Sequence, residues 1–66
     1  MKITLNGQPC TLDKALSITE LLSAQGFEGK TVAVAVNNTF VPKSAHEGHM
    51  LQDNDRVEVV APMQGG

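Results

Sequence analysis

The feature that most constrains the fold is one short amphipathic helix in a chain whose other apolar residues mostly alternate. Ser17 can cap the first free backbone N–H groups, and Glu20, three residues later, can reach back to Ser17 in a capping box. Gly26 ends the pattern, so a helix is predicted over Ile18 to Gln25. Its predicted inner face consists of Ile18, Leu21, Leu22 and Gln25. A helix of about two turns is not stable alone in water, so it must pack against a sheet.

The chain opens with a predicted β-hairpin. Residues 1–5 alternate between apolar and polar, which is typical of a strand with one buried face. Asn6-Gly7 follows, and this pair favours a two-residue hairpin turn because both turn positions require positive φ. A second strand is predicted from about Gln8 to Asp13. It belongs at a sheet edge, because Pro9 has no N–H to donate.

A third predicted strand, Thr31 to Asn37, has two unequal faces. Val32, Val34 and Val36 point to one side, and Ala33 and Ala35 point to the other. Asn37-Asn38 predicts a turn, after which Phe40 to Pro42 forms a short strand that ends at the proline. Residues 43–51 are predicted to be irregular or to contain a single helical turn.

The last predicted strand runs from Arg56 to Ala61, after a tight turn at Asp53 to Asp55. Val57, Val59 and Ala61 fall on one face of this strand, whereas Glu58, Val60 and Pro62 fall on the other. The helix between the hairpin and the later strands permits a crossover, so the last strand can run parallel to the first. The predicted fold class is therefore α+β, a β-grasp arrangement in which one main helix lies across one face of a mixed sheet. Residues 1–61 form the predicted domain, and residues 62–66 form a flexible tail.

Composition excludes several classes of function. A chain of 66 residues is one domain, too small to hold a buried catalytic cleft, so we do not expect a self-contained enzyme. A net charge of −2 and only two aromatic residues argue against nucleic acid as a partner. No stretch is long and apolar enough to span a membrane or resembles a signal peptide, so a cytoplasmic protein is predicted. We expect it to be a monomer on its own.

Three features that could suggest chemistry have plainer interpretations. Cys10 alternates with the apolar Leu12, so a structural role is predicted for this lone cysteine. His46 and His49 lack cysteine or carboxylate partners, so they are predicted to be solvated loop residues and no metal site is expected. The turn at 53–55 begins like a calcium loop, but it lacks the glycine and the closing glutamate of such loops.

The chain ends in Met63-Gln64-Gly65-Gly66. Two residues without Cβ atoms can lie extended in a slot too narrow for any side chain, so that the catalytic groups of a partner can close around the carboxylate of Gly66. Gly66 is therefore the predicted reactive residue. Met63, Gln64 and Gly65 are predicted to contact the partner.

These residues resemble the ThiS family, the ubiquitin-like sulfur carriers of thiamine thiazole synthesis. The likeness spans the whole chain, and it is most specific at residues 34–37 with Val41-Pro42 following, at residues 51–59 and at the final diglycine. Asn54 stands where the family usually has glycine, and Met63-Gln64 differs from the family's smaller or aliphatic approach to the diglycine. The resemblance implies that an ATP-dependent, E1-like enzyme adenylates the Gly66 carboxylate. A persulfide then supplies sulfur, the terminus becomes a thiocarboxylate, and a thiazole synthase accepts the sulfur; the carrier itself binds no cofactor.

Other functions share the same tail. The chain could carry sulfur for another pathway, such as molybdopterin synthesis, or it could be a protein modifier that is joined to lysine through Gly66. It could also be a β-grasp interaction module whose glycines are incidental. The intact mass of the protein separates these three functions. A sulfur carrier shows the exchange of one oxygen for sulfur, a modifier shows a ladder of conjugates, and an interaction module shows no change in mass.

A docking face is also predicted from the alternation of the strands. If the valines of the two predicted strands cover the helix side, then Ala33, Ala35 and Val60 lie together on the opposite side of the sheet. One helix cannot cover both sides. These residues therefore form a candidate docking surface that leads into Met63.

Overall fold

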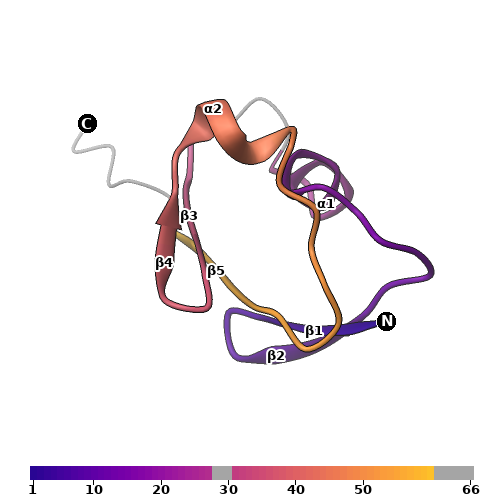
Figure 1. Cartoon of the computed structure of the whole chain (residues 1–66). Helices are drawn as coiled ribbons and strands as arrows, with labels where there is room; N and C mark the ends of the chain where they lie inside the picture. Colours follow the sequence, from indigo (N-terminus) through magenta and orange to yellow (C-terminus); the bar gives the residue numbers. More distant parts are fainter. Residues whose placement is uncertain (28–30, 61–66) are drawn as a thin grey trace.

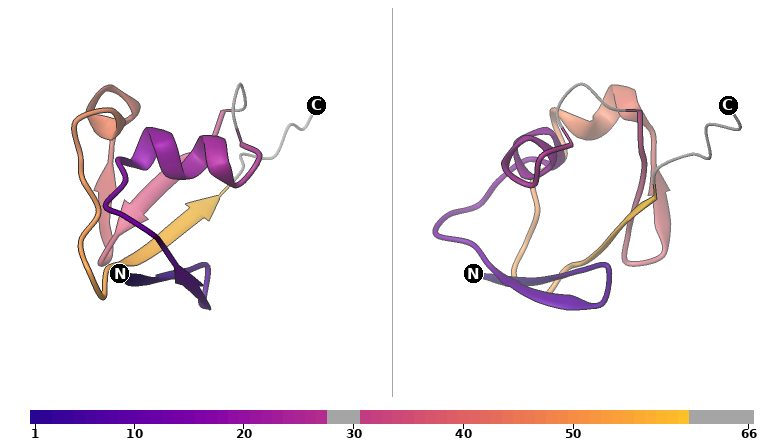
Figure 2. Two further views of the ribbon diagram at one scale, coloured as in Figure 1. Left: turned by 90° about the vertical axis from the view of Figure 1, so that its right-hand side faces the viewer. Right: turned by 180° about the vertical axis from the view of Figure 1, so that it is seen from behind.

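In this computed structural model, the structure describes residues 1–27 and 31–60. Within these ranges the elements in chain order are β1 (Lys2–Leu5), β2 (Gln8–Thr11), α1 (Ile18–Ala24), β3 (Ala33–Val36), β4 (Thr39–Val41), α2 (Lys43–His46) and β5 (Arg56–Val60). The strands of the described part form one five-stranded sheet in the order β2-β1-β5-β3-β4 (Figure 1). Figure 2 shows α1 lying across one side of this sheet. The predicted mixed sheet with one main helix is confirmed.

The N-terminal hairpin has the predicted turn. Asn6 and Gly7 have φ values of 51° and 81°, the positive values that the two central positions of this turn require. Pro9 lies on β2 and pairs with Thr4 of β1, and β2 is an edge strand as predicted. β2 ends at Thr11, two residues before the predicted Asp13.

Helix α1 begins with the predicted capping box. The Ser17 hydroxyl accepts a hydrogen bond from the Glu20 backbone N–H at 3.1 Å, and the Glu20 carboxylate accepts one from the Ser17 backbone N–H at 2.9 Å. The helix ends at Ala24, and Gly26 follows with a φ of 86°. Gln25 was predicted on the buried face, but this was wrong. It is the exposed C-cap residue, beyond the turns that face the sheet.

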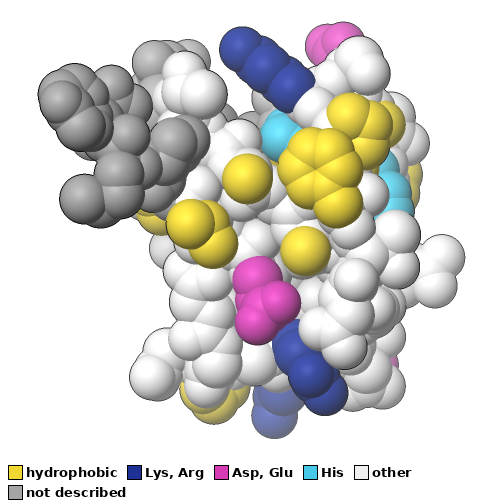
Figure 3. Space-filling view, turned by 90° about the vertical axis from the view of Figure 1, so that its left-hand side faces the viewer, with side chains coloured by type: hydrophobic (Ala, Val, Ile, Leu, Met, Phe, Trp, Pro, Cys, Tyr) yellow, Lys and Arg dark blue, Asp and Glu magenta, His cyan; other side chains and the backbone are white. Residues whose placement is uncertain are grey.

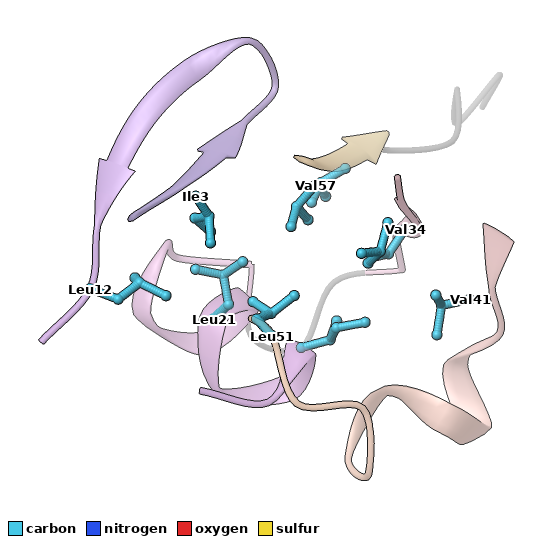
Figure 4. Packing of buried hydrophobic residues seen from close by; sticks show 10 residues of the cluster. Ile3, Leu12, Leu21, Val34, Val41, Leu51 and Val57 are labelled. Atoms are coloured by element: carbon cyan, nitrogen blue, oxygen red, sulfur yellow. The ribbon is translucent and has the colours of Figure 1, made fainter. Parts of the chain in front are cut away.

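The core lies between α1 and the inner face of the sheet (Figure 4). Its buried hydrophobic residues are Ile3, Leu12, Ile18, Leu21, Val34, Val36, Val41, Leu51, Val57 and Val59. All ten are aliphatic, and the whole chain has only two aromatic residues. Cys10 is partly buried and packs against this cluster, which confirms its predicted place beside Leu12.

The segment after β4 contains the predicted single helical turn, α2, but it also holds the main error of the sequence analysis. His46 was predicted to be a solvated loop residue, whereas it lies in α2 and is only 4% exposed. Its Nε2 atom donates a hydrogen bond to the Val41 carbonyl oxygen at 3.0 Å. This partner at the end of β4 makes burial of a polar ring possible. His49 is partly exposed.

Strand β5 lies in the middle of the sheet. It runs parallel to β1 and antiparallel to β3, as the crossover through α1 permits. The turn before it is the predicted one, because Asn54 has a φ of 73° and Asp55 accepts a hydrogen bond from the Gln52 backbone N–H at 2.8 Å. The predicted last residue of the strand, Ala61, lies outside the described residues.

Across residues 1–27 and 31–60, no helix has the length and apolar character needed to cross a membrane.

Candidate functional site

The candidate site consists of the end of β5 and the face of the sheet beside it. β5 ends at Val60, and the chain then enters residues 61–66, where four predicted site residues lie. These are Met63, Gln64, Gly65 and Gly66, and they fall outside the described residues. β5 is the central strand, so hydrogen bonds to the neighbouring strands hold the segment that precedes residue 61.

The sheet brings the three predicted docking residues together. Ala33 pairs with Val60 across β3 and β5, and Ala35 lies two residues further along the same face of β3. Val60 is 62% exposed, whereas its neighbour Val59 faces the core and is only 8% exposed. The predicted alternation of the two strands is therefore confirmed, and the outer face of the sheet carries the small and exposed apolar residues.

A fourth apolar residue joins this face and was not predicted to lie there. Phe40 on β4 pairs with Ala35 and is 64% exposed. The signal was available in the sequence, because a two-residue turn at Asn37-Asn38 aligns residue 40 with residue 35. We call Ala33, Ala35, Phe40 and Val60 the outer-face patch; these residues line one shallow hollow together with Asn6 and Glu58.

The outer-face patch has one acidic neighbour. Glu58 is exposed on β5, on the same side of the strand as Val60 and opposite Ala35. Figure 3 views this face, where hydrophobic side chains gather beside an acidic side chain. A partner that covers the outer-face patch must also accommodate the charge of Glu58, which favours a basic group at that point.

The side chains that could suggest chemistry do not gather at this face. No group of three or more His, Cys, Asp or Glu side chains in residues 1–27 and 31–60 could hold a metal ion. Cys10 lies on edge strand β2 and packs against the core, which is on the helix side of the sheet, opposite the outer-face patch. The described part of the chain thus combines a five-stranded sheet, an outer face with exposed apolar residues, and a central strand that ends at Val60.

Known proteins share the sequence and the fold. The model of the ThiS family matches residues 3–66. The sulfur carrier protein ThiS of Thermus thermophilus is 41% identical over 64 residues, with 97% of this chain and 98% of that protein covered. The thiazole synthase of Paramagnetospirillum magneticum is 33% identical over 66 residues, but this chain spans only 20% of that protein.

A solved structure confirms the predicted β-grasp fold. The crystal structure of the thiamine biosynthesis protein ThiS from Geobacter metallireducens is similar to this chain with a TM-score of 0.85 and 36% sequence identity. The similarity covers 100% of both chains.

Proposed function

The chain belongs to the ThiS family and is a sulfur carrier of thiamine biosynthesis rather than a catalyst, and from this we propose that the Gly66 carboxylate is the group that carries sulfur. The observation that supports this proposal most directly is the position of the diglycine. β5 is the central strand of the sheet, it ends at Val60, and the family match continues through Gly66. Other enzymes thus bind the folded domain, and residues 62–66 serve as a tail that enters their active sites.

The proposed chemistry begins with activation of the carboxylate. A carboxylate oxygen of Gly66 attacks the α-phosphorus of ATP in an adenylating enzyme, and pyrophosphate leaves. The terminal sulfur of a persulfide then attacks the carbonyl carbon of the acyl adenylate, and AMP leaves. A thiol reduces the resulting acyl disulfide, which releases the Gly66 thiocarboxylate and forms a new disulfide on the donor side. The thiocarboxylate is a better nucleophile than the carboxylate.

The diglycine fits the physical demands of these steps. The acyl adenylate and the thiocarboxylate must both be shielded from water, because hydrolysis returns either one to the carboxylate. A partner can enclose the terminus closely only if the last residues have no side chains that would hold the walls of the channel apart. Gly65 and Gly66 meet that condition.

A thiazole synthase is the proposed acceptor of the sulfur. Thiazole synthases are among the proteins to which this chain is similar, and in them the matching part occupies about a fifth of the length. A partner joined to a carrier-like segment in one chain has that segment at high effective concentration, which favours a direct transfer between the two.

The outer-face patch is the proposed docking surface for the adenylating enzyme. Val60 is the last residue of β5, so a partner seated on the outer-face patch covers the point from which the chain continues into residues 61–66. An apolar face that α1 does not cover offers burial to such a partner, and Glu58 offers it one charged contact.

Intact mass spectrometry of the protein purified from cells tests the carrier proposal. We expect a fraction whose mass differs from the unmodified chain by one exchange of oxygen for sulfur, located by fragmentation at Gly66. A variant with one residue appended after Gly66 is the matched control, because the added residue occupies the space of the nucleotide while the fold is unchanged. The extended variant should show no mass change from oxygen to sulfur, and it should not support ATP–pyrophosphate exchange by the adenylating enzyme. Undiminished ATP–pyrophosphate exchange by the extended variant would refute the proposal.

A further inference from the structure

The two strands beside β5 pair with different lengths of it. β3 pairs with β5 from Val57 through Val60. β1 pairs with it only opposite Arg56 and Val57, because β1 ends at Leu5 and the chain then reverses. Within the described residues, the second half of β5 therefore has a strand on one side only, at the point where it leads into the tail.

The side chain of Asn6 takes the place of the missing strand. The Asn6 backbone N–H donates to the Val57 carbonyl oxygen at 2.9 Å, which continues the ladder one residue past β1. The Asn6 side-chain oxygen Oδ1 accepts a hydrogen bond from the Val59 backbone N–H at 2.8 Å. In a parallel ladder, a backbone carbonyl of the neighbouring strand would accept this bond. The side-chain amide thus supplies the acceptor that a continued β1 would have supplied.

This hydrogen bond joins residues that are 53 positions apart in the chain. Its donor, Val59, is the residue before the last one of β5. A strand end that lacks hydrogen-bond partners on one side frays, and the segment that follows a frayed end can take many orientations. A bond on the free side of Val59 restrains the last described residues before the tail.

We propose that Asn6 is a positioning residue for activation: its side chain fixes the end of β5 and so sets the point and direction from which the tail enters the adenylating enzyme. The inference rests on the proposed function of Gly66. Asn6 acts through β5 and does not touch the reacting carboxylate. Its effect is to lower the conformational cost of ordering the tail on binding, which determines the affinity of the carrier for its enzyme.

A simpler explanation is that Asn6 is present only for the turn. Its φ of 51° lies in the left-handed region that asparagine tolerates better than most residues, so the turn alone would favour it. Asn38 provides the comparison, because it has a φ of 69° in the β3–β4 turn. Its side chain makes no hydrogen bond in the part of the chain that the structure describes. The two asparagines thus share a backbone conformation and differ in what the side chain does.

The test uses three variants of the full chain. Asn6→Gly keeps the positive φ and removes the acceptor oxygen, whereas Asn6→Asp keeps an acceptor oxygen and tolerates the same φ. Asn38→Gly is the matched control for loss of a turn asparagine. Amide hydrogen exchange of Val59, with buried Val34 as the reference, reports on the strand end. ATP–pyrophosphate exchange with the cognate adenylating enzyme gives KM and kcat for each carrier variant.

In Asn6→Gly, we expect Val59 exchange and the KM for the carrier each to rise about fivefold, the factor that corresponds to one net hydrogen bond. Val34 exchange should be unchanged, and kcat should change by less than about twofold, since the bound carboxylate is the same. Asn6→Asp should restore the slow exchange of Val59, because its carboxylate oxygen can accept the same hydrogen bond. Asn38→Gly should alter neither.

Three results would overturn the inference. Unchanged Val59 exchange in Asn6→Gly would show that the side chain does not hold the strand end. Faster exchange with unchanged KM would show that it holds the strand without positioning the tail. An equal rise of KM in Asn38→Gly would attribute the effect to general loss of stability. If the wild-type carrier is not activated at all, the proposed function fails instead, and Val59 exchange alone decides whether Asn6 holds β5.

Discussion

Single polar side chains hold distant parts of this small protein together. The Asn37 side chain donates to the Asp55 carboxylate at 3.0 Å and accepts from the Arg56 backbone N–H at 2.9 Å. His46 acts over a shorter range, because its ring holds α2 against the end of β4. In the part of the chain that the structure describes, no buried side-chain nitrogen or oxygen lacks a hydrogen-bond partner. Loss of one of these side chains therefore removes a hydrogen bond that joins two segments of the fold.

Substitution of His46 tests this at the scale of one residue. His46→Ala removes a buried ring and its hydrogen bond to the Val41 carbonyl, so we expect the free energy of unfolding to fall by about 2–3 kcal/mol. Chemical denaturation measures the change. His49→Ala is the control, because His49 is partly exposed, and its loss should cost less than about 0.5 kcal/mol. Equal losses in the two variants would contradict a structural role for His46.

At the scale of elements, helix α1 is stabilised by its packing and its cap rather than by its length. It spans only Ile18–Ala24, which is too short to form alone. Its buried residues Ile18 and Leu21 are fully covered by the core. The capping box then satisfies the free N–H of Glu20, and the same box satisfies the backbone N–H of Ser17.

Ser17→Ala should lower the free energy of unfolding by about 1 kcal/mol, because it removes the hydroxyl that accepts from Glu20. In a domain of this size that corresponds to a fall in melting temperature of about 4–8 °C, measured by circular dichroism. Glu20→Gln is the matched control, since the glutamine side chain keeps the oxygen that accepts from the Ser17 N–H. A Ser17→Ala variant that melts at the wild-type temperature would show that the capping box contributes nothing.

At the scale of the whole molecule, the two faces of the sheet differ. Helix α1 and the aliphatic core cover one face (Figure 4). The other face carries the outer-face patch, with Phe40 and Val60 both more than 60% exposed. Within the described residues, α1 lies on the core side of the sheet, and the exposed apolar residues of the outer-face patch lie on the other side (Figure 2).

A charge placed in the outer-face patch tests the docking proposal. Val60→Asp should weaken binding to the adenylating enzyme at least about tenfold, because the carboxylate would be desolvated in an apolar contact beside Glu58. Isothermal titration calorimetry measures the affinity. Met50→Asp is the matched control, because Met50 is also an exposed apolar residue and does not line the hollow of the outer-face patch. Both variants should melt as the wild type does. Equal affinities of Val60→Asp and wild type would place the docking surface elsewhere.

The sequence by itself determined the features that depend on local backbone requirements. Asn6-Gly7 and Asn37-Asn38 predicted turns because only certain residues accept positive φ, and the structure has positive φ at all four. The Ser17–Glu20 box lies within one turn of helix, so its geometry follows from spacing alone. Alternation assigned Val57, Val59 and Val60 to their faces of β5, because the side-chain period of a strand is fixed.

The tertiary structure alone decided which groups from different elements meet. The burial of His46 depends on a carbonyl at the end of β4 that lies in its reach only after α2 has folded against the strand. The contact of Asn6 with Val59 depends on β1 and β5 lying side by side, and it joins residues 53 positions apart. Local propensity and period describe a residue and its immediate neighbours, whereas these contacts depend on the order of the strands and on where each of them ends.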